Sequence, residues 1–305
     1  MVTCSSPGKI YLFGEHAVVY GESAVACAVE LRTRVTVVPA ESTSITSGGQ
    51  PLAIGEEPYI QNTLKIMEEF LALPPVSIRI DSEIPIAAGI GSSAALTVAL
   101  LRALSIEFGV EMDLSLIAAT AHRIERLVQG AASPTDTFVS TMGGVVVVPE
   151  RRHLPPPGCK IVIGDAGIGT GAGAAMREKT GEMVLRVADL REAYPDAVDP
   201  VISAIGGLAR SGVLLLEEGD CRGVGKLMNI NHGLLEALGV GTTRLLRLVH
   251  AARDAGAFGA KITGAGGGGC MVALADNARE VAQGIERAGG KAMVVEIAQE
   301  GVRKE

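Results

Sequence analysis

The sequence predicts an α+β protein with two domains. Its 305 residues are enough for two hydrophobic cores. Strand-like runs of apolar residues are mixed along the whole chain with segments whose apolar residues recur every three or four positions, as they do in helices. The segment Pro155–Gly158, three prolines and a glycine, is the best linker candidate. We therefore predict one domain over residues 1–157 and a second over residues 158–305.

Local signals place several elements in the predicted N-terminal domain. Asp113 is expected to cap a helix that runs to about Gln129, where Gly130 ends it. Residues 41–50, rich in Ser, Thr and Gly, are expected to form a surface loop or hairpin. One face of a further helix carries Ile60, Leu64, Met67 and Leu71. Strands are predicted at Ile10–Phe13, Leu31–Val38, Val76–Ile80 and Gly144–Val148.

The predicted C-terminal domain contains more helix than strand. Asp276 is expected to cap its last helix, which ends at Gly289 and Gly290. The other helices are expected over residues 181–193, 199–217, 222–237 and 243–255. Strands are expected at Lys160–Asp165, Met271–Leu274 and Ala292–Ile297.

The composition excludes several classes of protein. The net charge is −7 and the Lys and Arg residues are scattered, so the chain lacks the basic face that nucleic acids require. It has no Trp and few other aromatic residues on which bases could stack. The 5 cysteines form no CxxC pair, which favours reduced thiols in the cytoplasm. The chain starts with no charged-then-apolar leader, and we expect neither export nor a membrane partner.

The stretch from Ile84 to Gly109 has the pattern of a phosphate-binding loop followed by a helix. Gly89 and Gly91 keep side chains out of the loop, and Ser92 and Ser93 stand where a helix would begin and could cap it. Such a loop offers backbone N–H groups to an anion, and the positive end of the helix dipole adds to the attraction. The stretch is therefore a candidate for holding phosphate.

Three other interpretations of this stretch stay open. Residues 84–101 carry no charge, which raises the question of a membrane span, although Pro85 and the small polar residues argue against one. The spacing Gly89-x-Gly91-x-x-Ala94 fits the loose dinucleotide fingerprint, but Glu107, the candidate ribose ligand, lies inside the helical pattern. A capped, alanine-rich core helix would also produce this sequence without any ligand.

A second glycine cluster, Gly264–Gly269, contains a single non-glycine residue. Such a segment packs almost no side chains, so another group should approach its backbone closely, unless it is only a wide turn between two strands. Two candidate phosphate loops favour an enzyme that uses a nucleoside triphosphate. The Walker motif GxxxxGK[ST] and the HRD and DFG triplets are absent, which excludes ordinary P-loop enzymes and protein kinases.

Residue types for phosphoryl transfer are present, although spacing alone does not bring them together. Ser92 or Ser93 offers a hydroxyl group and Glu125 a carboxylate to Mg²⁺. Asp136, in a Ser-Pro-Thr-Asp loop, can be aimed at a substrate hydroxyl, and Lys9 can offset developing negative charge. Each residue also has an ordinary interpretation as a helix cap, a solvated helix face, a turn former or a surface lysine.

Three segments together resemble the motifs of the GHMP kinase superfamily, in order and at compatible spacing across the whole chain. They are Pro7–Gly21, Pro85–Ala95 and Lys261–Cys270. The run Glu-His-Ala-Val-Val in the first segment and the loop Ser133–Asp136 are similar to the mevalonate kinase branch of the superfamily. Ala87 and Ile90 depart from the usual second motif, Pro-x-Gly-x-Gly-Leu-Gly-Ser-Ser, and we expect this change to tune ATP binding without abolishing it.

The resemblance implies roles for individual residues. Asp136 would take the proton of the acceptor hydroxyl or orient it, with Lys9 beside it and the transferred phosphoryl group. Ser93 and Glu125 would bind Mg²⁺. ATP would be bound by Ser82, Pro85, Ala87, Ala88, Gly89, Ile90, Gly91, Ser92, Ser93, Ala94 and Ala95. The acceptor, mevalonate, would be contacted by Glu15, His16, Gly264, Ala265 and Gly266.

The resemblance also implies a fold and a reaction. The fold would pair a ribosomal S5 domain 2-like N-terminal domain with a ferredoxin-like C-terminal domain, with the active site in the cleft between them. The reaction would move the γ-phosphate of ATP to the C5 hydroxyl of mevalonate, in a cytoplasmic enzyme that is a homodimer, as is usual among relatives. Two alternatives stay open: the same fold acting on phosphomevalonate or a sugar, and a catalytically silent regulator that binds a nucleotide or metabolite.

Overall fold

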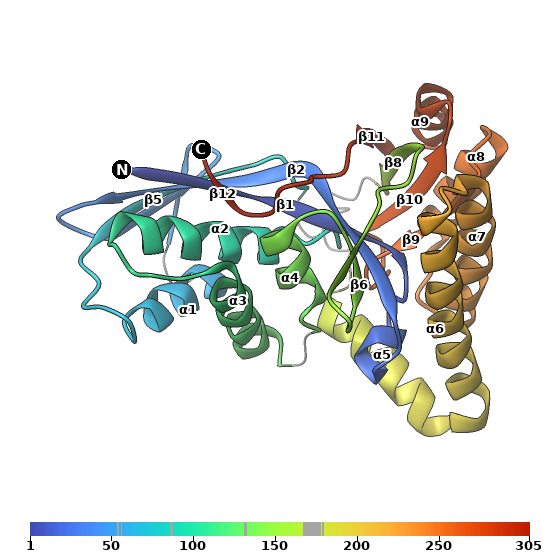
Figure 1. Ribbon diagram of the computed structural model, residues 1–305, viewed down its shortest axis with the longest axis horizontal. Coiled ribbons are helices and arrows are strands. Elements are labelled where there is room, and N and C mark those ends of the chain that lie inside the picture. The colour runs from blue at the N-terminus through green and yellow to red at the C-terminus, as the bar shows by residue number, and fades with distance from the viewer. Residues whose placement is uncertain (54, 56, 86–87, 131–132, 167–177, 179) are drawn as a thin grey trace.

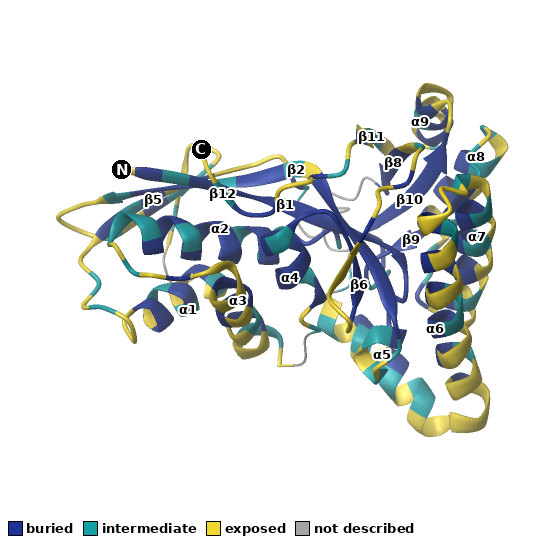
Figure 2. Ribbon diagram, in the orientation of Figure 1, coloured by how far each residue is buried: buried dark blue, intermediate teal, exposed yellow. Residues whose placement is uncertain are grey.

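The computed structural model describes residues 1–53, 55, 57–85, 88–130, 133–166, 178 and 180–305. In this part of the chain two β-sheets lie next to each other, and helices cover the outer side of each sheet (Figure 1). The strands are largely buried, whereas connecting turns and the outer helix faces are exposed (Figure 2). The arrangement confirms the predicted α+β class.

The first sheet is built around the long antiparallel hairpin of β1 and β2. Its strand order is β12-β1-β2-β5-β3-β4, with β6 pairing to β2 and β7 pairing to β6. Strands β1 and β2 extend well beyond their predicted segments, because pairing in the sheet satisfies the backbone groups of polar stretches too. The strands are β1 (Val2–Phe13), β2 (Ala24–Pro39), β3 (Ser44–Ser47), β4 (Gln50–Leu52), β5 (Val76–Ser82), β6 (Val145–Val148), β7 (Arg152–Leu154) and β12 (Arg303–Lys304).

Among the helices that cover the first sheet, one predicted N-cap is found and another is not. The carboxylate of Asp113 caps α3 as predicted, accepting a hydrogen bond from the Leu116 N–H at 2.7 Å. The N-cap of α2 is Gly91, with a φ of 81°, so the prediction that Ser92 or Ser93 caps this helix is wrong. The elements are η1 (Ala17–Tyr20), α1 (Pro58–Met67), α2 (Ser92–Glu107), α3 (Leu114–Gln129) and α4 (Thr135–Met142).

The second sheet has the strand order β11-β8-β10-β9 and is antiparallel throughout. Its strands are β8 (Lys160–Asp165), β9 (Gly259–Thr263), β10 (Cys270–Ala275) and β11 (Lys291–Val295). Its helices are α5 (Thr180–Ala193), α6 (Pro195–Glu217), α7 (Cys221–Ala237), α8 (Thr243–Asp254) and α9 (Ala278–Arg287). Helices separate β8 from β9 and β10 from β11, which gives the βαββαβ topology of a ferredoxin-like domain, as expected.

The last helix has a different cap from the predicted one. The side chain of Asn277, not that of Asp276, accepts a hydrogen bond from the Glu280 N–H, at 3.3 Å. The carboxylate of Asp276 instead lies 3.2 Å from the guanidinium of Arg222 on α7. Asp and Asn are both good capping residues, and of these two neighbours it is Asn277 that caps the helix.

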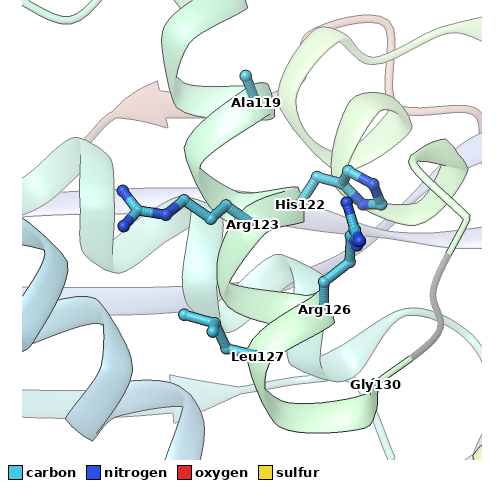
Figure 3. Close-up of a pocket in the computed structure, with 6 residues that line it drawn as sticks. All are labelled: Ala119, His122, Arg123, Arg126, Leu127 and Gly130. Atoms are coloured by element: carbon cyan, nitrogen blue, oxygen red, sulfur yellow. The ribbon is translucent and has the colours of Figure 1, made fainter.

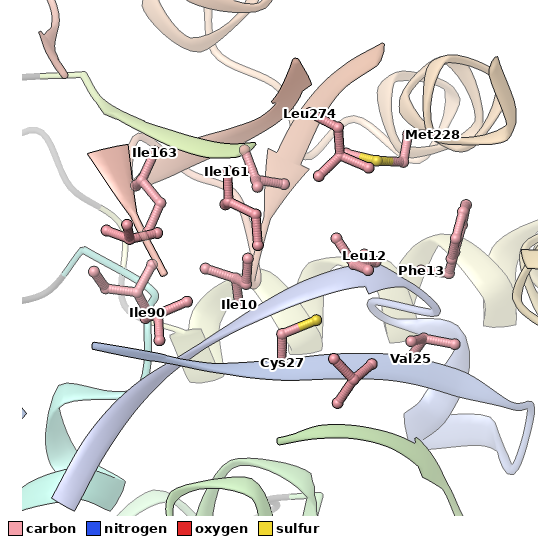
Figure 4. Close-up of a cluster of buried hydrophobic side chains, with 14 of the residues drawn as sticks. Ile10, Leu12, Phe13, Val25, Cys27, Ile90, Ile161, Ile163, Met228 and Leu274 are labelled. Carbon is pink, nitrogen blue, oxygen red and sulfur yellow. The ribbon is translucent and has the colours of Figure 1, made fainter. Parts of the chain in front are cut away.

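A hydrophobic core fills the space between the two sheets (Figure 4). Side chains alternate along β1, so Ile10 faces this core while its neighbours Lys9 and Tyr11 face the opposite side. The core therefore fixes the direction in which Lys9 points. Its members include Ile10, Leu12, Val25 and Cys27 of the first sheet, Ile161, Ile163 and Leu274 of the second, and Met228 of α7.

The structure also bears on the interpretation of residues 84–101 as a membrane span. Within residues 84–101, considered as a membrane span, the described residues before Ser92 are bends and loop, and residues 92–101 belong to α2. Among the described helices, α6 is the one long and apolar enough to cross a bilayer. Core helices pass the same criterion, and Ile205 and Ala209 of α6 are fully buried.

Strand β12 pairs with β1, so the chain ends on the first sheet. The division at residues 157 and 158 remains a prediction.

Candidate active site

The centre of the candidate site is an ion pair between Lys9 on β1 and Asp136 in the first turn of α4. The Lys9 Nζ lies 2.8 Å from an Asp136 carboxylate oxygen, and Lys9 is only 2% exposed while Asp136 keeps 27% of its side chain exposed. The Tyr11 hydroxyl donates to the other carboxylate oxygen at 3.4 Å, and the Lys9 ammonium lies 4.3 Å from the centre of the Tyr11 ring. The Asp136 carboxylate is thus held by two buried side chains, Lys9 and Tyr11, and its exposed side is accessible to a substrate.

Burial keeps Tyr11 protonated. It raises the pKa of the phenol well above its ordinary value, and the negative charge of Asp136 adds to the effect. A protonated phenol donates its hydrogen to a neighbouring carboxylate. Tyr11 therefore helps to orient Asp136 and is not itself a candidate base. No pattern in the sequence pointed to this orienting role.

Glu125 on α3 is a buried carboxylate with an unused oxygen. Its Oε1 accepts a hydrogen bond from the Gln129 side chain at 3.3 Å, while its buried Oε2 has no hydrogen-bond partner among the described residues. Burial and, to a smaller extent, the negative charge of Asp136 raise the pKa of Glu125 to about 8, against the opposing charge of Lys9. A buried carboxylate oxygen without a donor is costly, and a hard cation such as Mg²⁺ would relieve that cost.

Ser93 and Glu125 are linked through side chains that the sequence did not single out. The Gln129 amide donates to the Tyr59 hydroxyl at 2.6 Å, and the same hydroxyl is hydrogen bonded to Ser93. Gln129 follows Glu125 by one helical turn, so its contact could have been expected, whereas nothing local pointed to Tyr59 on α1. The structure therefore brings both predicted metal ligands to one network.

The first glycine loop is tied to β1 next to this pair. The Lys9 N–H donates to the Ile90 carbonyl at 2.8 Å, and a side chain at Gly91 would place its Cβ 3.3 Å from the Lys9 backbone nitrogen. Ser82 lies where the loop begins, and its hydroxyl is 2.9 Å from that of Thr33 and accepts from the Ile84 N–H at 3.2 Å. Ala87, predicted to contact ATP, lies outside the described residues.

The second glycine loop packs against the first. A Cβ at Gly264 would lie 2.5 Å from the Gly89 carbonyl oxygen, and a Cβ at Gly269 would lie 2.6 Å from the Ala88 carbonyl oxygen. The close approach expected from the glycine content is therefore made, at these two positions, by the other loop. The two candidate phosphate loops form one backbone surface beside Lys9.

Replacing Gly264 by alanine is expected to separate the two loops. The new methyl group would collide with the Gly89 carbonyl, and the φ of +77° is unfavourable for alanine. We expect a loss of about 2–4 kcal/mol in the free energy of unfolding, together with weaker ATP binding, measured by urea denaturation and calorimetric titration. Gly233→Ala on α7, where nothing lies within 4 Å, is the control and should not destabilise the protein. Equal stability of both variants would contradict the packing of the loops.

Glu15 and His16 lie in the turn after β1. His16 adopts a φ of 62°, and its Nε2 lies 3.0 Å from the Ala265 carbonyl oxygen. Burial lowers the pKa of His16, so the ring is neutral and donates from Nε2, because a carbonyl can only accept. The Glu15 carboxylate pairs with Lys261 on β9. The turn is thus joined to the second glycine loop and to the second sheet.

A separate hollow of about 420 Å³ lies on the outer side of α3 (Figure 3). His122 and Arg126 project into it, and burial together with the charges of Arg126 and Arg151 lowers the pKa of His122. None of the predicted site residues that the structure describes lines it. Glu125 precedes Arg126 in the chain but is buried on the inner side of the helix.

Comparison with known proteins agrees with the geometry. Residues 58–144 match the N-terminal domain of GHMP kinases, and residues 213–293 match their C-terminal domain. The mevalonate kinase of Pyrococcus horikoshii is 41% identical over 335 residues, covering 100% of this chain and 98% of its own. The chain belongs to the GHMP kinase family.

Two further relatives support the same family and fold. The mevalonate kinase of Thermococcus sibiricus is 40% identical to this GHMP kinase, covering 100% of this chain and 98% of its own. The crystal structure of the Methanococcus jannaschii mevalonate kinase is 28% identical with a TM-score of 0.79, covering 97% of this chain and 98% of that one. The resemblance in the three glycine-containing motifs is therefore confirmed at the level of the family and the two-domain fold.

Proposed function

We propose that this GHMP kinase transfers the γ-phosphoryl group of ATP to the C5 hydroxyl of mevalonate, which gives 5-phosphomevalonate and ADP. The observation that carries the proposal is the Lys9–Asp136 ion pair, which lies beside the glycine loops with one side of its carboxylate exposed. The names of the relatives that are about 40% identical over the full chain support the choice of acceptor.

In the proposed reaction the acceptor oxygen bonds to the γ-phosphorus as the bond to the leaving ADP oxygen breaks. Asp136 orients the hydroxyl group and receives its proton. Lys9 offsets negative charge on the phosphoryl oxygens and holds Asp136 in place. Because the transition state is loose, positioning contributes more than the strength of the base. The joined backbones of the loops around Gly89 and Gly264 offer N–H groups to the phosphates.

Ser93 and Glu125 are the proposed Mg²⁺ ligands. The free, buried Oε2 of Glu125 and the hydroxyl of Ser93 are hard oxygen donors in one network with Tyr59. When bound, Mg²⁺ would neutralise negative charge on the phosphates of ATP. The proposal includes contacts of Glu15, His16 and the Gly264–Gly266 segment with mevalonate. A cytoplasmic homodimer is a further proposal, made from the family resemblance.

The alternatives are a different acceptor and a silent regulator. Phosphomevalonate would need additional cations in the acceptor pocket, and Lys261 is already paired with Glu15. A silent regulator should have lost part of the set of Lys9, Ser93, Glu125 and Asp136, and all four are present.

The test is ADP release from ATP and Mg²⁺ with mevalonate, phosphomevalonate, galactose and homoserine offered in parallel. We expect turnover with mevalonate alone. Turnover with another acceptor instead would refute the proposed acceptor and keep the phosphoryl-transfer site. ATP binding without turnover of any acceptor would favour the regulator.

A further inference from the structure

Glu15 and Lys261 form an ion pair that is sealed from solvent. The two side chains are 1% and 0% exposed, and the Lys261 ammonium contacts Oε1 of Glu15. The ammonium also donates to the Ile262 carbonyl at 2.6 Å. Glu15 belongs to the first sheet's β1 turn and Lys261 to the middle of β9, so the pair joins the two sheets.

The charges around the pair leave Lys261 as the main partner of Glu15. Burial raises the pKa of Glu15, and the positive charge of Lys261 opposes this, with a smaller effect from Lys9. Burial lowers the pKa of Lys261, and Glu15 opposes this. His232 of α7 also faces Lys261, but burial lowers the pKa of His232 to about 3, so the imidazole is neutral. Without Lys261, the buried Glu15 carboxylate would keep only a hydrogen bond from its own backbone and the weaker attraction of Lys9.

The second carboxylate oxygen of Glu15 has no hydrogen-bond partner in the described part of the chain. Its Oε2 is buried and accepts no hydrogen bond from any described residue. Lys261 and Thr263 share one face of β9, and the Thr263 hydroxyl accepts from the Tyr11 N–H at 2.7 Å. Tyr11 in turn donates to Asp136. Glu15 also lies close enough to Lys9 and Tyr11 for charge to act between them, because Lys9 lowers the pKa of Glu15 and Glu15 raises that of Tyr11. Glu15 is therefore near the Lys9–Asp136 pair.

We propose that Lys261 is a positioning residue, which keeps Glu15 ionised and leaves its second oxygen free to accept a hydrogen bond from the acceptor. This inference rests on the proposed function, in which the acceptor alcohol binds beside Asp136. The hydroxyl that is phosphorylated gives its proton to Asp136, so Glu15 accepts from a different hydroxyl group of the same acceptor. An anionic carboxylate can only accept, whereas a protonated one would compete as a donor.

The test is Lys261→Met, which keeps the length of the side chain and removes its charge. We expect the KM for mevalonate at pH 7 to rise by about 10- to 100-fold, the factor that corresponds to one hydrogen bond to a charged group. The KM for ATP should not change. The KM for mevalonate should fall again as the pH rises, because Glu15 without Lys261 ionises only at higher pH. Lys160→Met on β8, whose exposed ammonium pairs with Glu296, is the matched control and should behave as the wild type.

A purely structural role would reduce the amount of folded enzyme and leave the KM and its pH dependence unchanged, and that result would overturn the inference. If Lys261→Met does not fold, Glu15→Gln is compared with the double variant Glu15→Gln/Lys261→Met, which buries no unpaired charge. We expect the two to have the same KM for mevalonate. A further loss in the double variant would overturn the inference, since Lys261 would then act other than through Glu15. Failure of the wild type to phosphorylate mevalonate would refute the proposed function instead, and the same variants would be measured with the acceptor that is turned over.

Discussion

Asp136→Asn is expected to reduce kcat by about 10²- to 10⁴-fold, the usual contribution of a positioned acid or base. Asparagine has nearly the same shape and can still accept a hydrogen bond from Tyr11, but it cannot take the proton of the acceptor hydroxyl. It also leaves the buried ammonium of Lys9 without its ion-pair partner. Steady-state kinetics would measure kcat, and a titration with ATP would test whether nucleotide binding survives.

Asp113→Asn is the matched control for this substitution. Asp113 caps α3, and asparagine caps helices about as well as aspartate. We expect this variant to keep its turnover and its stability. If Asp136→Asn kept near-normal turnover, Asp136 would have no role in the mechanism.

Elements with strong local signals were predicted correctly from the sequence. Helix α3 begins after Asp113 and ends before Gly130, as predicted, because a capping carboxylate and a glycine at either end are local features. Strand β9 was not assigned, since its five residues lie between two glycine-containing segments and include the buried Lys261. A buried lysine breaks the apolar pattern, and only its partner on another element explains it.

The candidate site was predicted less from its residues than from the family resemblance. Spacing could not bring Lys9 to Asp136, because the two belong to elements that only the packing of α4 against β1 joins. Tyr59 carried no local signal, and Lys261 stood only as the first residue of the third motif, with no role assigned. Each role is recognised only from the contact that the residue makes with a predicted residue. Ser82 was predicted to contact the nucleotide, and this role stays a prediction. In the structure its hydroxyl accepts a hydrogen bond from the Ile84 N–H, where the first glycine loop begins.

Glu125→Gln is expected to lower turnover while it raises the stability of the folded protein. Turnover with ATP and Mg²⁺ should fall by orders of magnitude, because glutamine would bring no negative charge to the proposed Mg²⁺ site. The free energy of unfolding without nucleotide should instead increase at neutral and alkaline pH. The pKa of the buried Glu125 is raised to about 8, whereas an unfolded glutamate titrates near its ordinary value of 4.5.

The sign of the stability change follows from this difference. Between these two pKa values the folded protein keeps a proton that the unfolded chain has released, so the wild type loses stability as the pH rises. The loss is about 1.4 kcal/mol for each pH unit in this window. Glutamine carries no such proton, so the gain of Glu125→Gln over the wild type should grow from pH 5 to pH 8 and reach several kcal/mol.

Urea denaturation of both proteins at pH 5, 6, 7 and 8 would measure this gain. Glu69→Gln is the control, because Glu69 is an exposed carboxylate whose pKa is lowered by its hydrogen bonds to Arg123 and whose titration therefore lies below this window. Its stability should follow that of the wild type across the series, and its turnover should be unchanged. Parallel pH curves for Glu125→Gln and the wild type would mean that Glu125 is ionised in the empty protein, and the unused Oε2 would then need a bound cation or donor at all times.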